Sequence, residues 1–168
     1  PLVKRNRLSR KPPQDYALDK PASAYAQAVK SLFTSLIIAH QRKGTGNIVL
    51  LTSAVPGEGK SALVATLARV TAIAGRRVLI VDCDLRRPNI HRSLSLPNQY
   101  GLADFLSGNA TLPDVMRTDS RTGADVITAG SPTDNPEEII RNPLFDQMLF
   151  NLRPQYDLIL LDAPPVLP

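Results

Sequence analysis

The stretch SAVPGEGKS, at positions 53–61, contains residue types that can hold the phosphates of a nucleotide. Gly57 and Gly59 allow backbone N–H groups to turn towards phosphate oxygens, and the ammonium of Lys60 can reach the β and γ phosphates. The hydroxyl of Ser61 is a suitable ligand for Mg²⁺. The residues that we expect to bind the nucleotide are Pro56, Gly57, Glu58, Gly59, Lys60, Ser61 and Ala62.

This stretch departs from the phosphate-loop pattern G-x-x-x-x-G-K-[ST] at its first position, where Ala54 replaces glycine. Alanine is the smallest alternative to glycine and fits wherever the backbone φ angle is negative. The pattern still predicts a phosphate-binding loop, because an apolar strand precedes it and a helical pattern follows it. The helix that begins near Lys60 would add its positive end to the site.

Three aspartates follow apolar segments and are candidates for metal binding and proton transfer. Asp82 and Asp84 lie in VLIVDCDLRRP, and Asp162 ends LILLD. In an open parallel sheet, the carboxyl ends of the strands meet at the edge that binds the ligand, so we expect all three beside the loop. Mg²⁺ needs one or two carboxylates, which leaves another to orient or deprotonate a nucleophile.

The elements that must position these residues follow from the hydrophobic pattern. Apolar strands separated by helical periodicity predict an α/β protein, with a P-loop NTPase-like three-layer α/β/α fold around a mainly parallel sheet. We expect the sheet to be incomplete at its C-terminal end. The predicted strands are 47–53, 76–84, 124–129 and 156–162, and the predicted helices are 23–42, 61–75, 101–108 and 135–152, the last opened by Asn135 or Pro136.

The composition indicates one domain, residues 22–168, after a linker of residues 1–21. The linker contains Pro12, Pro13 and Pro21, which favour an extended segment. The five basic residues within its first eleven positions equal the whole net charge of +5 and favour a solvated tail, a juxtamembrane segment or, least of all, a nucleic-acid arm. A single cysteine, Cys83, and the absence of a long apolar run predict a soluble segment in a reducing compartment, with a membrane anchor expected upstream.

Three motifs, SAVPGEGKS, VLIVDCDLRRP and LILLDAPP, resemble the A, A′ and B nucleotide motifs of the bacterial protein tyrosine kinases that govern capsule and exopolysaccharide export. The resemblance extends from about Tyr16 to Pro168 and includes GLADFLSG and AGSPTDNPEEII. Its most discriminating part is the pattern Asp-x-Asp-x-Arg formed by Asp82, Asp84 and Arg86.

The resemblance implies a role for each matching residue. Lys60 and Ser61 would hold the phosphates of ATP and Mg²⁺, and Asp82 would accept the proton of a tyrosine hydroxyl. Ser61, Asp84 and Asp162 would be the Mg²⁺ ligands. The position of Arg86 and Arg87 just beyond the carboxylates favours a role in clamping a phosphate or ordering the site, more for Arg86 than for Arg87, which gives Lys60, Asp82, Asp84 and Arg86 as the catalytic set.

The resemblance also implies partners. Members of the family have a membrane-spanning copolymerase or activator region, fused or separate, acceptor tyrosines in a C-terminal tail, and a Glu-x-x-Arg-x-x-Arg motif for homo-oligomers. The matching helix here has Gln27, Lys30 and Phe33, which counts against self-association through that motif. These features imply a location on the cytoplasmic face of a bacterial inner membrane and no nucleic-acid partner.

Two other functions remain open from the residues. One is a non-enzymatic, ATP-sensing scaffold of a polysaccharide copolymerase, favoured by the departures at Gln27, Lys30 and Phe33. The other is a partition or septum-positioning ATPase, whose loop has an extra lysine at the position of Val55 here. The intact Lys60 and three aspartates favour an ATP-dependent protein tyrosine autokinase that regulates polysaccharide synthesis and export.

Overall fold

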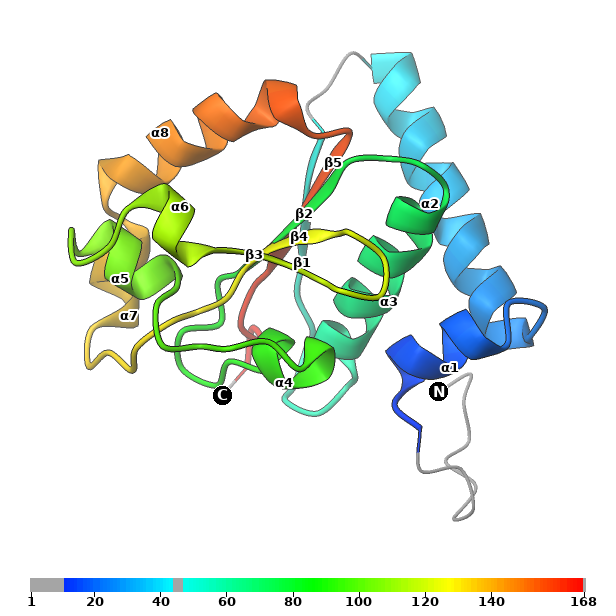
Figure 1. Ribbon diagram of the computed structural model, residues 1–168, viewed down its shortest axis with the longest axis horizontal. Helices are drawn as coiled ribbons and strands as arrows, with labels where there is room; N and C mark the ends of the chain where they lie inside the picture. Colours follow the sequence, from blue (N-terminus) through cyan, green and yellow to red (C-terminus); the bar gives the residue numbers. More distant parts are fainter. Residues whose placement is uncertain (1–10, 44–46, 168) are drawn as a thin grey trace.

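The computed structural model describes residues 11–43 and 47–167, and it shows a sheet between two layers of helices (Figure 1). The strands pair in the order β1-β5-β2-β4-β3, and only the pair of β3 with β4 is antiparallel. The three-layer, mainly parallel fold predicted from the sequence is therefore confirmed. The strands are β1 (Ile48–Leu51), β2 (Val78–Asp82), β3 (Met116–Thr118), β4 (Asp125–Ile127) and β5 (Leu158–Asp162).

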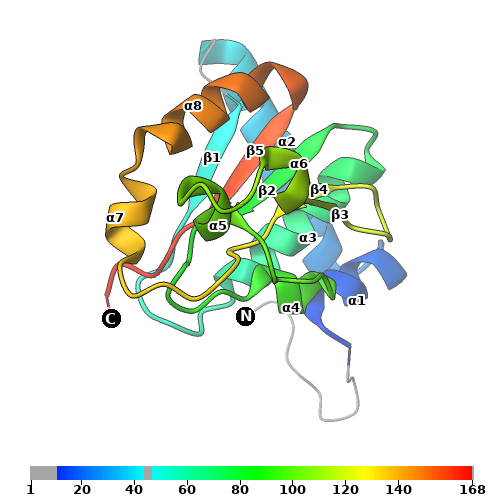
Figure 2. The same ribbon diagram turned by 60° about the vertical axis from the view of Figure 1, so that its left-hand side comes forward.

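Helices α2 and α3 cover one face of the sheet, and α5, α6 and α8 cover the other (Figure 2). No helix in the described part of the chain is both long enough and apolar enough to cross a membrane. The helices are α1 (Pro13–Asp19), α2 (Ala24–Lys43), α3 (Lys60–Ile73), α4 (Ile90–Leu94), α5 (Leu102–Leu106), α6 (Leu112–Val115), α7 (Pro136–Ile140) and α8 (Pro143–Leu152), with a 3₁₀ turn at Arg153–Gln155.

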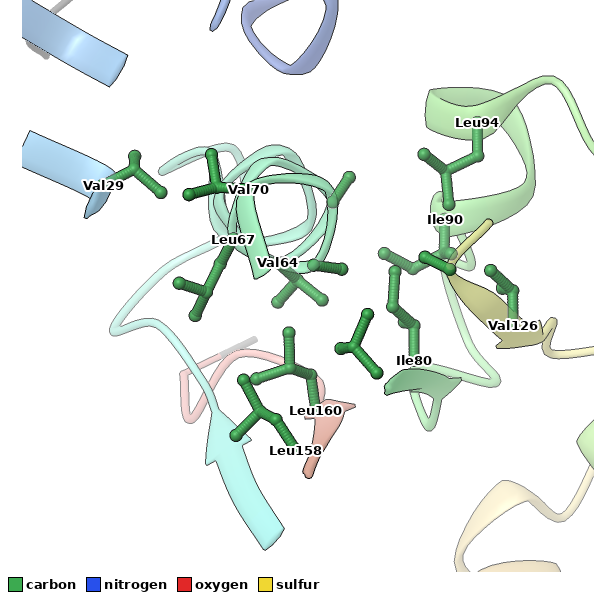
Figure 3. Close-up of a cluster of buried hydrophobic side chains, with 14 residues drawn as sticks. Val29, Val64, Leu67, Val70, Ile80, Ile90, Leu94, Val126, Leu158 and Leu160 are labelled. Carbon is green, nitrogen blue, oxygen red and sulfur yellow. The ribbon is translucent and has the colours of Figure 1, made fainter. Parts of the chain in front are cut away.

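Successive side chains along the central strands β2 and β5 point to opposite faces of the sheet, which divides the core into two hydrophobic layers. Ile80 and Leu160 point towards α3 and pack with Val64 and Leu67 (Figure 3). Their neighbours along the strands point to the opposite face and pack beneath α5 and α8. Both central strands are fully buried, which explains why their sequences are continuous apolar runs rather than alternating ones.

The segment that precedes the domain is a packed helix, so the expectation of an extended linker is wrong over residues 13–19. Pro13 occupies the first turn of α1, where proline costs no hydrogen bond and its fixed φ suits a helix. Gln14 and Ala17 are buried, and the Gln14 amide donates to the carbonyl of Ser93 at 2.8 Å. The part of the basic run that precedes Lys11 lies outside the described residues.

An ionic network attaches α1 to α3. The guanidinium of Arg69, on α3, is buried and forms a two-point ion pair with Asp119 and a third contact with Asp15 at 2.6 Å. Arg121 joins the same Asp15 at 2.7 Å and Asp19 at 2.9 Å. These ion pairs stabilise the packing of α1 against α3. The prolines and charges of the linker sequence did not indicate this packing.

The helix predicted over 135–152 is divided in two. Pro143 cannot continue the hydrogen-bond ladder of the preceding turn, and the side chain of Asn142 caps the new helix by accepting from the Leu144 N–H at 3.0 Å. Three short elements, α4, α6 and the antiparallel β3, were not predicted, because segments of three to five residues carry too little periodicity.

The end of β4 is held by a close approach of two glycine backbones. A side chain on Gly101 would overlap the backbone of Gly130 and Thr128. The Asp104 carboxylate accepts from the N–H groups of Gly101 and Ser131, at 2.9 and 3.0 Å. This contact anchors the segment that leads from β4 to α7, beside the carboxyl ends of the parallel strands.

Candidate active site

The predicted phosphate loop connects β1 to α3. Gly57 and Gly59 have φ angles of +82° and +87°, which side chains rarely adopt, and α3 begins at Lys60 as expected. The carboxylate of Glu58 accepts from the N–H groups of Ala54, at 2.8 Å, and Val55, at 3.2 Å. This side chain holds the start of the loop at the position where the usual glycine is missing.

Lys60 lies between two of the predicted aspartates. Its Nζ is 2.5 Å from Asp162 Oδ1 and 3.7 Å from Asp84 Oδ2, and its side chain is 8% exposed. Because β2 and β5 are parallel and Asp82 is in register with Asp162, the strand ends place all these groups at one edge of the sheet. The structure therefore brings together Lys60 and the three aspartates, as the sequence predicted.

Asp82 is fully buried beneath this cluster. Its two oxygens accept from the N–H groups of Asp84 and Ile90, each at 3.2 Å. Burial raises the pKa of Asp82 to about 7, and the nearby charge of Asp162 adds to the rise. Asp82 does not line the open cavity, whereas Asp84 does. A tyrosine hydroxyl would have to displace one of these backbone bonds to reach it.

The two carboxylate oxygens of Asp162 differ in their contacts. Oδ1 holds Lys60, while Oδ2 is buried and has no hydrogen-bond partner among the described residues. Burial raises the pKa of Asp162, against the lowering effect of Lys60. An unpartnered carboxylate oxygen beside the Asp84 carboxylate and the Ser61 hydroxyl supplies the oxygen donors that Mg²⁺ prefers, so these residues fit the ion.

The described residues contain no group of three or more His, Cys, Asp or Glu side chains placed to hold a metal. Mg²⁺ is commonly bound by one or two carboxylates together with waters and the phosphates of the substrate. A shared site of that kind matches the set of Ser61, Asp84 and Asp162.

A cavity of about 340 Å³ opens over the loop. It includes every residue predicted to bind the nucleotide, from Pro56 to Ala62, together with Asp84. Four further residues line it: Arg87, which the sequence offered as a second phosphate-clamping arginine, and Ser53, Asn89 and Pro165, which the prediction omitted. Asn89 and Pro165 follow the ends of β2 and β5, so the strand-end rule that located the aspartates could also have found them.

Arg86 lies outside this cavity. Its guanidinium pairs with Glu137 of α7 at 2.6 Å and lines a neighbouring hollow of about 400 Å³, with Asp134 and Arg141. The structure thus places Arg86 at the rim, in contact with the segment that follows β4, rather than among the phosphate-binding groups.

The residues that match the oligomerisation motif lie on α2. The side chains of Gln27 and Lys30 donate to the carbonyl of Pro21, at 3.2 and 3.3 Å, and Phe33 packs against the core. The expectation that the departures from the motif count against self-association through α2 stays a prediction.

Two of the four tyrosines have hydrogen-bonded hydroxyls. The Tyr25 hydroxyl bonds Thr66 and the Tyr156 hydroxyl donates to Asp125, both at 2.9 Å.

Comparison with known proteins agrees with this geometry. Residues 46–168 match the family described as "AAA domain". The chain is 37% identical over 151 residues to tyrosine-protein kinase Etk of Escherichia coli, which is 90% of this chain and 21% of that protein. It is 31% identical over 165 residues to tyrosine-protein kinase YwqD of Bacillus subtilis, 98% of this chain and 69% of that protein.

Solved structures give the same result. The kinase domain of Escherichia coli ETK superposes with a TM-score of 0.86 and 35% identity, over 96% of this chain and 64% of that one. The septum site-determining protein MinD of Pyrococcus horikoshii, complexed with Mg-ADP, is more distant, at a TM-score of 0.62 and 27% identity over 74% of this chain and 51% of that one.

The chain spans about a fifth of the length of Etk and of several other curated relatives, but more than two thirds of YwqD. The shared region contains the loop, the paired aspartates after β2 and Asp162 after β5. The chain belongs to the bacterial protein tyrosine kinases, within the P-loop proteins of the AAA domain family.

Proposed function

We propose that the protein is an ATP-dependent protein tyrosine autokinase that regulates exopolysaccharide or capsular polysaccharide synthesis and export. The observation that carries this proposal is the placement of Lys60 between Asp162 and Asp84 at the mouth of the loop. Phosphoryl transfer needs mainly positioning and charge neutralisation, and a buried, preoriented lysine beside two carboxylates supplies both.

The loop residues have a direct task in this reaction. The N–H groups of Gly57 to Ser61 and the positive end of α3 would bind phosphate oxygens, since α3 is 14 residues long and starts at Lys60. Ser61, Asp84 and Asp162 would hold Mg²⁺, which when bound neutralises charge on the β and γ phosphates. Lys60 would exchange part of its contact with Asp162 for a phosphate oxygen.

Asp82 would accept the proton of the acceptor tyrosine as the tyrosine oxygen bonds to the γ phosphorus and ADP departs. Its position in register with Asp162 supports this role. The bond from the Ile90 N–H to Asp82 Oδ2 must open for the hydroxyl to approach. Arg86 would order the acceptor side of the site through its ion pair with Glu137.

The regulatory context is also proposed. The resemblance implies a membrane-spanning copolymerase region as partner, acceptor tyrosines on a neighbouring subunit and a position on the cytoplasmic face of the membrane. A homo-oligomer would be consistent with transfer between subunits. Its contacts would differ from the usual motif, because Gln27 and Lys30 are engaged with Pro21.

The test is phosphotyrosine formation by the full-length protein, purified from cells that lack other tyrosine kinases and supplied with ATP and Mg²⁺. We expect a signal that Lys60→Met and Asp82→Asn abolish. Binding of ATP by the wild type with no phosphotyrosine would overturn the kinase assignment and favour the nucleotide-sensing scaffold. In that case Asp82→Asn would leave polysaccharide output in cells unchanged.

A further inference from the structure

Lys60 and Arg87 both line the nucleotide cavity, but they differ in their ion pairing. Lys60 is already paired with Asp162 and Asp84. Arg87 also lines the cavity, but no carboxylate of the described residues lies within 4.0 Å of its guanidinium. An arginine is always charged and has five N–H donors in a planar fork, which matches the geometry of a phosphate or a carboxylate.

Two consecutive arginines serve separate hollows. Arg86 pairs with Glu137 at 2.6 Å in the hollow beside α7, whereas Arg87 lines the cavity over the phosphate loop. The backbone of Arg87 is fixed, because its N–H donates to Asp84 Oδ1 at 3.0 Å. The same carboxylate therefore contacts Lys60 through one oxygen and sets the position of Arg87 through the other.

We propose that Arg87 is a further catalytic residue of the proposed kinase reaction, and that its guanidinium contacts the γ phosphate of ATP. The loop and the start of α3 line the cavity from the side of β1, whereas Arg87 follows β2 and lines the same cavity beyond Asp84. The inference rests on the proposed function for its reaction, but its binding prediction is independent of phosphoryl transfer.

The contact is electrostatic and requires no covalent step by the arginine. As the γ phosphoryl group moves from ADP to the tyrosine oxygen, negative charge is spread over its equatorial oxygens. A guanidinium at these oxygens contacts bound ATP but not bound ADP, which lacks the group, and the charge that spreads during transfer makes this contact stronger in the transition state than with bound ATP. Arg87 would therefore distinguish ATP from ADP and would accelerate transfer.

The experiment compares Arg87→Ala, Arg87→Lys and the control Arg92→Ala in the full-length protein. Dissociation constants for ATP and ADP are measured by calorimetry with Mg²⁺ present, and phosphotyrosine formation is followed under single-turnover conditions. We expect Arg87→Ala to weaken ATP binding about tenfold to a hundredfold and ADP binding less than about twofold. Arg87→Lys should recover part of the binding of ATP but little of the rate.

The control variant removes an exposed positive charge on α4, outside the nucleotide cavity, and should leave the ratio of ATP to ADP affinity unchanged. Because both arginines are exposed, all variants should melt at the wild-type temperature. Unchanged ATP affinity in Arg87→Ala would overturn the inference. An equal loss for ATP and ADP would overturn the γ-phosphate assignment.

The failure of this inference and the failure of the proposed function give different results. If the wild type binds ATP but forms no phosphotyrosine, the kinase assignment fails, while a selective loss of ATP affinity in Arg87→Ala still supports the γ-phosphate contact. If the wild type forms phosphotyrosine and Arg87→Ala matches its rate and affinities, only the assignment of Arg87 fails.

Discussion

The ammonium of Lys60 and the Asp162 carboxylate form a buried ion pair, with Nζ 2.5 Å from Oδ1, at the junction of α3 and β5. Both side chains are at least nine-tenths buried, so each charge offsets the desolvation cost of the other. The phosphate-binding lysine is therefore also a structural residue, and this dual role affects how its variants must be interpreted.

Lys60→Met should destabilise the fold as well as remove nucleotide binding. It leaves Asp162 and Asp84 buried without their cation, which costs about 3 kcal/mol of unfolding free energy. Lys60→Met combined with Asp162→Asn should recover most of that stability but no ATP binding. Denaturant unfolding and ATP titration of both variants provide the check. A double variant no more stable than Lys60→Met would contradict the paired role.

The pair of Arg69 with Asp119 should make stability depend on acidity. Burial alone favours neutral Asp119, but hydrogen bonds from Arg69 and Thr122 outweigh it and hold the pKa of Asp119 below its usual value of 3.8. A group with a lowered folded-state pKa stabilises the protein above the unfolded pKa and loses this contribution as the pH falls through the folded pKa. The advantage of wild type over Asp119→Asn should be about 3 kcal/mol at pH 7 and shrink below about pH 4.

Urea unfolding at a series of pH values measures that advantage directly. Asp157→Asn is the control, because the Asp157–Arg77 ion pair lies at the surface and should contribute less than about 1 kcal/mol. A constant difference between wild type and Asp119→Asn across the acid range would show that the ion pair is not the origin of the effect.

Gly101→Ala should be strongly destabilising because its methyl group would meet backbone atoms of Gly130 and Thr128, which cannot rotate away. We expect a loss of about 3 kcal/mol or more. Gly123→Ala is the matched control. Gly123 has a φ of +79° and no atom within 4 Å of an added methyl, so only backbone strain of about 1 kcal/mol applies. Thermal unfolding distinguishes the two, and equal losses would contradict the packing argument.

Two tyrosines should remain unmodified during autophosphorylation. The hydroxyls of Tyr25 and Tyr156 are bound to Thr66 and Asp125. Tyr25→Phe and Tyr156→Phe should each lower stability by about 1 kcal/mol and leave the phosphotyrosine signal unchanged. Peptide mapping of the phosphorylated protein tests this. Tyr100, which is 51% exposed, is the comparison residue, and phosphate on Tyr25 or Tyr156 would refute the prediction.

Strong local patterns predicted the central part of the fold and most of the site. Apolar runs before Asp82 and Asp162 indicated buried parallel strands, and the glycine spacing around Lys60 indicated the loop between a strand and a helix. The register of β2 with β5 then places Asp82 directly beside Asp162. Strand direction alone predicted that both carboxylates lie at one edge of the sheet, whereas the adjacency of β2 and β5 comes from the folded structure.

Features that depend on long-range partners could not be read from the sequence. Helix α1 forms because Asp15 meets arginines that lie 54 and 106 residues further along the chain. The placement of Arg86 outside the nucleotide cavity depends on its contact with Glu137, which only the folded chain brings near. The interruption at Pro143 is of another kind, because it depends only on a local feature of the sequence: a proline cannot continue the preceding helix.

The ionic attachment of α1 to α3 has a mechanical consequence. Arg69 lies on the helix whose first residue is Lys60, and it is joined through Asp15 to the segment that enters the domain. A force applied to α1 would pass through the Asp15–Arg69 ion pair to α3, and along this helix to the phosphate loop at its first residue. A displacement of α1 would therefore be coupled to the phosphate loop that binds the nucleotide.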